Sequence, residues 1–134
     1  MRPTMRPASL MLLLCLALIS CQPPEDWSAT SSSDSGVQVR IETVTAPTLG
    51  RSPIVVRVSE GGKPVNVAAV EITGDMTHAG MIPVIRRATA IETGLYRADT
   101  FEFTMAGDWV VTADIDLING NEVKGKVEIF VPGK

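Results

Sequence analysis

The last third of the chain alternates apolar and polar residues so regularly that extended strands are the only regular structure it suits. In "WVVTADIDL" (109–117) every second residue from Trp109 to Leu117 is apolar, and "VKGKVEIFV" (123–131) repeats the pattern. Successive side chains of a strand point to opposite faces, so each run predicts a strand with one buried face. Asn119-Gly120 between them is a strong hairpin signal. The polar residues expected to face water are Thr112, Asp114, Lys124 and Lys126.

Similar runs of alternating or β-branched residues occur at "VQVRI" (37–41), "PIVVRVS" (53–59) and "NVAAVEIT" (66–73). In "GLYRADTFEF" (94–103) the phase slips, and the two phenylalanines join the face of Tyr96 only if a bulge intervenes near Asp99-Thr100. No long window has a helical period with caps. About seven short strands separated by Gly, Pro and Asn turns predict an all-β, immunoglobulin-like β-sandwich. A small barrel is the alternative.

The first 20 residues have the features of a secretory signal peptide. Arg2 and Arg6 form a basic leader, and the run from Leu10 to Ile19 is almost entirely apolar. That run is shorter than the roughly 20 apolar residues that a membrane-spanning helix needs. We therefore expect residues 1–20 to direct export and then to be removed.

The cleavage region "LISC" (18–21) resembles the lipobox of bacterial lipoproteins, which implies that Cys21 is lipidated and becomes the new N-terminus. The Ser- and Pro-rich stretch that follows predicts a flexible tether over residues 21–36. A single domain would then occupy residues 37–134. The expected location is the bacterial cell envelope, with the domain anchored to a membrane by lipid and facing the periplasm or the exterior. A plain secreted protein is the alternative.

Charge and residue types exclude several classes of function. The chain has 12 Lys and Arg against 15 Asp and Glu, and loss of two arginines with the signal changes the net charge from −3 to −5. An acidic domain does not suit nucleic acid as a partner. Cys15 would leave with the signal, so the domain has no thiol, and its lone histidine offers no nucleophile–base pair. We therefore do not expect an enzyme.

The segment "GDMTHAGMIP" (74–83) places Met76 and Met81 around His78, the single histidine of the chain. An edge strand kinked at Ala79-Gly80 would present these three side chains around one point. Two thioethers and an imidazole suit Cu(I), a soft ion. The competing interpretation is structural: methionine commonly fills irregular gaps in cores, and Met105 is most simply such a residue.

The segment from residue 71 to 117 resembles the YtkA-like domain, which is related to FixH-type proteins. The resemblance rests on motif order and spacing: Met76, His78, Met81 and Pro83; then Gly94, Tyr96 and Ala98; then Phe103, Met105, Gly107 and Trp109. It implies a sandwich related to copper-resistance and copper-chaperone domains, with a role in copper handling outside the cytoplasm. It makes Met76, His78 and Met81 candidate copper(I) ligands and Met105 a possible fourth.

Two functions therefore remain open. In the first, the domain binds Cu(I) and exchanges it with a copper donor or acceptor protein. In the second, it is a metal-free accessory module that docks onto a cell-envelope complex through a sheet edge or the loop around Arg86-Arg87.

Overall fold

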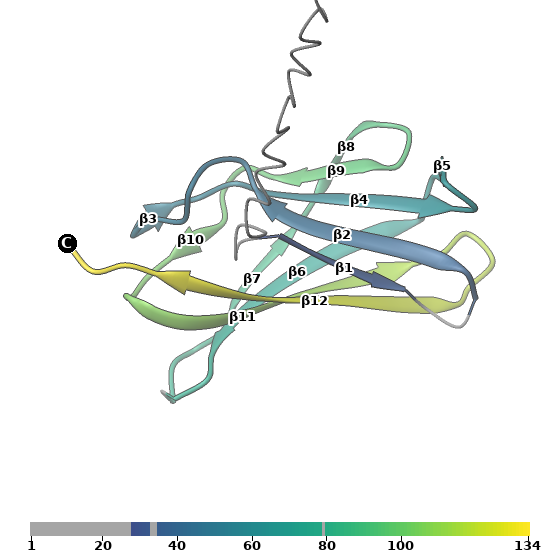
Figure 1. Ribbon diagram of the computed structural model, residues 1–134. Coiled ribbons are helices and arrows are strands. Elements are labelled where there is room, and N and C mark those ends of the chain that lie inside the picture. The colour runs from purple at the N-terminus through teal and green to yellow at the C-terminus, as the bar shows by residue number, and fades with distance from the viewer. Residues whose placement is uncertain (1–27, 33–34, 79) are drawn as a thin grey trace, which may run out of the picture.

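The computed structural model describes residues 28–32, 35–78 and 80–134, and its strands form two packed sheets (Figure 1). The predicted signal segment, residues 1–20, and Cys21 lie outside the described residues. Among the residues that are described, no helix is long and apolar enough to cross a membrane.

Both large sheets are antiparallel, and no strand of one pairs with a strand of the other. The six-stranded sheet has the order β1(Ser28–Ser32), β2(Val37–Thr43), β4(Ile54–Glu60), β9(Leu95–Ala98) and β8(Thr89–Glu92), with β5(Lys63–Pro64) paired to β4. The four-stranded sheet has the order β12(Glu122–Val131), β11(Gly107–Asp116), β6(Ala69–Met76) and β7(Val84–Arg87). β3(Gly50–Arg51) and β10(Glu102–Phe103) form a small third sheet. The predicted sandwich is confirmed, and the barrel alternative is not.

The core lies between the two large sheets, where the alternating residues of both inner faces meet. β11 and β12 pair along their whole lengths, from Gly107–Val131 to Asp116–Glu122. The predicted hairpin closes through hydrogen bonds that Gly120 N–H donates to Leu117 O and Leu117 N–H donates to Asn121 O. The inward residues of these two strands are buried as expected: Trp109, Val111, Ala113, Ile115, Val123, Val127, Ile129 and Val131.

The bulge expected near Asp99-Thr100 is not what brings Phe101 and Phe103 to the buried face. Phe101 and Phe103 are both fully buried, but the chain does not bulge to bring them there. It leaves the six-stranded sheet after Ala98, turns, and joins β3 in the small third sheet through β10. The turn resets the side-chain alternation because the chain changes its pairing partner, which a sequence pattern does not reveal.

The sheet also begins earlier than the sequence indicates. β1 pairs with β2 over five residues, from Ser28–Glu42 to Ser32–Gln38, within the segment expected to be a tether. Its ladder uses backbone groups that any non-proline residue carries, so "SATSS" forms a strand without an apolar alternation. β1 forms because the edge of β2 offers unpaired backbone groups, and the sequence of β1 alone does not predict this pairing.

An aromatic cluster fills one end of the core. The rings of Phe101 and Phe103 meet edge to face at 5.3 Å between centroids, and those of Phe103 and Trp109 at 5.2 Å. Gly74 of β6 lies directly against this cluster: a Cβ added there would come within 2.5 Å of Phe101 Cζ. The close approach of β6 to the rings therefore requires the absence of a side chain at residue 74.

Gly74→Ala should lower the free energy of unfolding by about 1–3 kcal/mol, because overpacking a buried ring forces its neighbours out of place. Urea denaturation of the wild type and the variant measures the difference. Gly80→Ala is the matched control, since a Cβ at that exposed loop position meets nothing within 4 Å. Equal stability of the Gly74 variant and the wild type would contradict this account of the packing.

Candidate functional site

Met76 is the last residue of β6 and lies opposite Trp109 of β11. Its side chain is half-buried and packs against the core. It reaches across to the start of β11, where a methyl group added to Gly107 would lie 2.9 Å from Met76 Cε. The thioether of Met76 therefore lies at the boundary between the aromatic end of the core and solvent.

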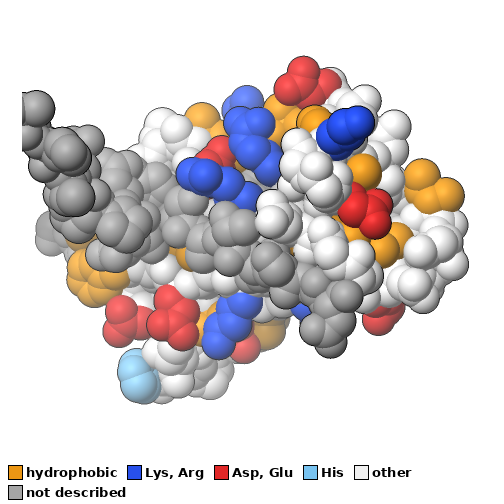
Figure 2. Space-filling view, turned by 45° about the vertical axis from the view of Figure 1, so that its right-hand side comes forward, with side chains coloured by type: hydrophobic (Ala, Val, Ile, Leu, Met, Phe, Trp, Pro, Cys, Tyr) orange, Lys and Arg blue, Asp and Glu red, His pale blue; other side chains and the backbone are white. Residues whose placement is uncertain are grey.

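His78 lies in the connection between β6 and β7, which spans residues 77–83. The N–H of Thr77 donates a hydrogen bond of 3.3 Å to Asp108 O, which ties the start of this connection to β11. The imidazole is exposed, and Figure 2 shows it in pale blue at the tip of a projection. His78 is therefore accessible to a ligand or to another protein.

Met81 lies in the same connection and is half-buried against the core, whereas its neighbour Ile82 is 87% exposed. The expected kinked edge strand is absent: β6 ends at Met76 and β7 begins at Val84. Ala79 is outside the described residues. Met81 is brought back toward the core by the loop and not by strand alternation, so the period-two argument does not apply to it.

Met105 approaches the same end of the sheet from a different part of the chain. It lies in the bend between β10 and β11 with 48% of its surface exposed. Its carbonyl oxygen accepts a hydrogen bond of 2.9 Å from Nε1 of the buried Trp109. Trp109 is also the ladder partner of Met76, so one residue of β11 contacts both methionine-bearing segments.

All four predicted ligands thus come from two segments that meet at the same end of the four-stranded sheet. Two of the thioethers, Met76 and Met81, are half-buried, while His78 and Met105 are more exposed. Among the described residues, no cluster of three or more His, Cys, Asp or Glu could hold a metal ion. The thioether and imidazole side chains at the end of the sheet fit Cu(I), which makes this end the candidate site for a soft ion.

One carboxylate that the sequence places on a polar strand face, Asp114, takes part in an ion pair on the surface. Asp114 forms an ion pair with Lys124 directly across the β11–β12 ladder. This carboxylate, through its hydrogen bond and its charge, raises the pKa of the exposed Lys124 ammonium. Cross-strand pairs of opposite charge are a normal means of stabilising a sheet.

The fold and this end of the sheet define a β-sandwich domain with a Met/His rim. A family model described as YtkA-like matches residues 31–114, which is more than half of the 134-residue chain. The chain therefore belongs to the YtkA-like family. The match extends from β1 into β11 and includes all four candidate ligands.

A solved structure shows the same type of fold at low sequence identity. A DUF4785 family protein from Legionella pneumophila is similar over 74% of this chain, with a TM-score of 0.55 and 11% identity. The chain spans 29% of the length of that protein. CopC from Methylosinus trichosporium OB3b is similar over 66% of this chain and 90% of its own, with a TM-score of 0.46 and 20% identity. A search of curated proteins gives no match.

Trp109→Phe should cost about 1 kcal/mol or more of unfolding free energy, because the ring stays large while the donor to Met105 O is lost. Chemical denaturation measures the cost, and hydrogen exchange should show faster exchange around residues 104–107. Met105→Ala is the control, since the bond is made by the backbone carbonyl and survives the loss of the side chain. Unchanged exchange in the tryptophan variant would refute the role given to the indole.

Proposed function

We propose that this protein is a non-enzymatic, extracytoplasmic copper-handling domain that binds Cu(I) through Met76, His78 and Met81, with Met105 as a fourth ligand. The observation that carries the proposal is the meeting of the β6–β7 connection and the bend before β11 at one end of the sheet. Membership of the YtkA-like family supports it, because the family resemblance implies copper handling outside the cytoplasm.

The burial of the ligands suits exchange better than permanent storage. Met76 and Met81 are held against the core, so their thioethers need little reorganisation to meet an ion. His78 and Met105 are more accessible and are the ligands that an acceptor protein would replace first. A copper donor or acceptor is then the expected partner, and transfer proceeds by stepwise replacement of thioether and imidazole ligands.

His78→Ala should weaken Cu(I) binding by at least about tenfold, since even the loss of an outer-shell partner commonly costs 10–100-fold in metal affinity. The measurement is anaerobic competition for Cu(I) between the full chain and a chromogenic chelator. Because the histidine is exposed, the melting temperature without copper should stay near that of the wild type.

Three further variants, Met76→Leu, Met81→Leu and Met105→Leu, separate ligation from packing. Each removes the sulfur but keeps an apolar side chain of similar volume, which normally costs less than about 1.5 kcal/mol. Loss of Cu(I) affinity with retained stability is the expected result. Equal copper retention by the histidine variant, the three leucine variants and the wild type would remove the proposal.

The protein is also proposed to be a lipoprotein, anchored by acyl chains on Cys21 after removal of residues 1–20. Several acyl chains give stable membrane attachment, because each buried CH₂ contributes about 0.8 kcal/mol. Cys21→Ser should move the protein from the membrane fraction to the soluble fraction of fractionated cells. Ser28→Thr, which leaves the whole LISC motif in place, is the control. Equal fractionation of the cysteine variant and the wild type would contradict lipid anchoring.

A metal-free interaction module is the second candidate. It is favoured by the exposed apolar side chains beside the site, Ile82 and Ile85, of which the first is 87% and the second 50% exposed. Docking through Arg86 has less support, because its Nε already donates to Thr100 O and its Nη1 to Ile85 O. This alternative requires two results. The wild type captures an envelope protein without copper, and Ile82→Ser loses that capture. Neither the wild type nor any variant binds Cu(I).

A further inference from the structure

The outer face of the six-stranded sheet carries four side chains in a single row across four strands. The ladder pairs Arg40 of β2 with Arg57 of β4, Arg57 with Leu95 of β9, and Leu95 with Glu92 of β8. Directly paired residues point to the same face of a sheet, and this face is turned away from the core. Along the row, two positively charged side chains are followed by an apolar one and then by a negatively charged one.

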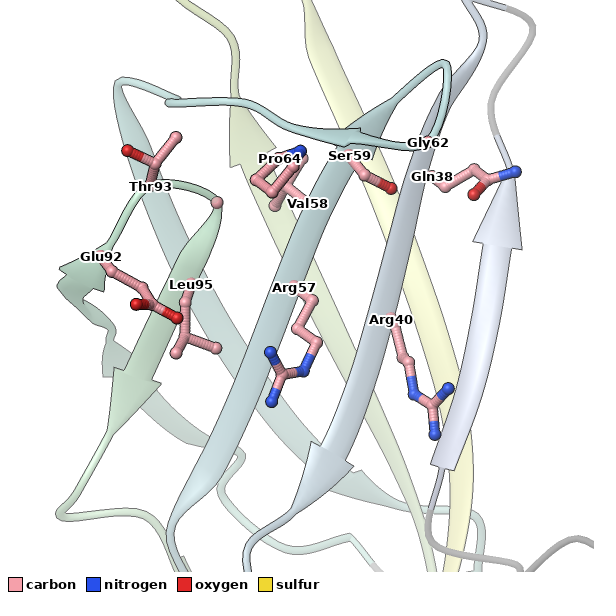
Figure 3. A pocket seen from close by; sticks show the side chains of 11 residues that line it. Gln38, Arg40, Arg57, Val58, Ser59, Gly62, Pro64, Glu92, Thr93 and Leu95 are labelled. Carbon is pink, nitrogen blue, oxygen red and sulfur yellow. The ribbon is translucent and has the colours of Figure 1, made fainter.

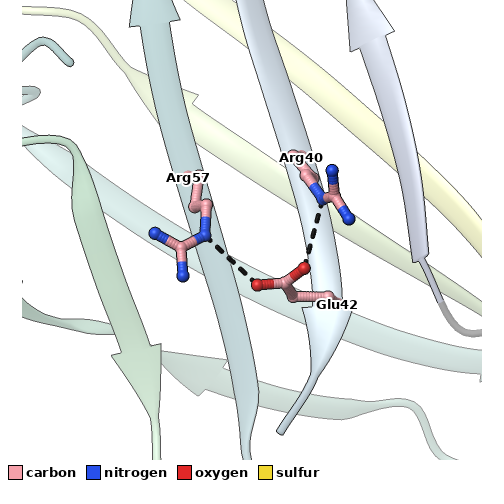
Figure 4. Close-up of polar contacts among 3 residues, drawn as sticks. All are labelled: Arg40, Glu42 and Arg57. Carbon is pink, nitrogen blue, oxygen red and sulfur yellow. Dashed lines mark hydrogen bonds and ion pairs between the residues drawn. The ribbon is translucent and has the colours of Figure 1, made fainter.

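The two arginines are held by one carboxylate. Glu42 accepts hydrogen bonds of 3.1 Å from Arg40 Nε and 3.2 Å from Arg57 Nε (Figure 4). A guanidinium has five N–H groups, and these bonds use the single N–H of each Nε. The terminal nitrogens lie on the far sides from Glu42, those of Arg57 toward β9 and those of Arg40 toward β1. The bond to Glu42 thus orients the Arg57 guanidinium, and its terminal N–H groups have no hydrogen-bond partner among the described residues.

A groove of about 320 Å³ lies over this row. Figure 3 shows Leu95 between the Arg57 guanidinium and the Glu92 carboxylate, with Pro64 and Thr93 at the upper rim. A hydrogen bond of 2.8 Å from Val58 N–H to the carbonyl of Gly94 joins two residues that line the groove. None of the ion pairs of the described residues joins Arg57 to Glu92, so the opposite charges stay apart across the groove.

The charges of this groove favour a zwitterion over a simple anion. Arg40, Arg57 and Glu92 line it, and Glu42 is bonded to both arginines, so a ligand with only a negative charge gains little net attraction. The positive and negative ends are nevertheless separated by two strand spacings, or about 10 Å between backbones, and long side chains shorten that gap. A ligand that carries both a carboxylate and an ammonium can contact both ends, and Leu95 offers an apolar surface between them.

We propose that this groove binds a free α-amino acid or a short peptide. The carboxylate is held by the terminal nitrogens of Arg57, the ammonium by Glu92, and an apolar side chain packs on Leu95 and Pro64. Arginine is well suited to the first role, because its planar fork matches a carboxylate. The site lies on the six-stranded sheet and is independent of the copper proposal, which concerns the end of the other sheet.

The test is an NMR titration of the full, ¹⁵N-labelled chain with L-leucine and with the dipeptide glycylleucine. 4-Methylpentanoate and isoamylamine are matched probes, because the first is leucine without its ammonium and the second is leucine without its carboxylate. Saturable shifts of the Ser59, Gly94 and Leu95 amides are expected with a zwitterion. Each single-charge probe should bind about tenfold more weakly or worse, since one charge-assisted contact is lost.

Variants assign the two ends of the ligand. Arg57→Gln and Glu92→Gln should each weaken binding of the zwitterions by about tenfold or more, and Arg40→Gln by less, because its terminal nitrogens point toward β1. Arg87→Gln on the other sheet should have no effect, and circular dichroism checks that every variant folds. The proposal is overturned if neither zwitterion gives saturable shifts at millimolar concentration, or if 4-methylpentanoate binds as well as L-leucine.

Discussion

The packing of Trp109 at one end of the sandwich is the interaction on which the functional end of this domain depends. The indole is fully buried, meets Phe103 edge to face, and lies across the ladder from Met76. Its N–H is bonded to the carbonyl of Met105. One side chain therefore connects the core, the end of β6 and the bend before β11. Together with the hydrogen bond from Thr77 N–H to Asp108 O, it holds the two methionine-bearing segments at a common end of the sheet.

The domain separates two kinds of surface that a small sandwich can offer. At the end of the four-stranded sheet, loops carry soft donors whose sulfur atoms rest partly on the core. On the outer face of the six-stranded sheet, rigid strands present charged side chains in register. Loops allow ligands to be exchanged, whereas a strand face fixes the spacing between charges. The two surfaces therefore suit different ligands, and the core between them does not have to change for either one.

The alternation of apolar and polar residues predicts some strands of this domain and not others. Alternation correctly identified the inward residues of β2, β4, β11 and β12, because burial of one face imposes a period of two. It failed at Phe101 and Phe103, where a change of pairing partner resets the phase. It also missed β1, whose residues carry no apolar pattern. The motif of methionines and histidine identified the candidate ligands, but the strand on which the interpretation relied to present them ends at Met76.

By itself, the sequence determined the all-β class, the buried faces of the long strands, the hairpin at Asn119-Gly120 and the residue types able to hold a soft ion. These follow from local rules: side-chain alternation, turn chemistry and ligand softness. Tertiary structure alone decided that Met105 reaches the end of the sheet where Met76 lies, and that Arg40, Arg57, Leu95 and Glu92 form one row. Both arrangements depend on which strands pair and in which register. Strand pairing joins residues that are far apart in the chain, and the local sequence pattern of a strand does not identify its partner.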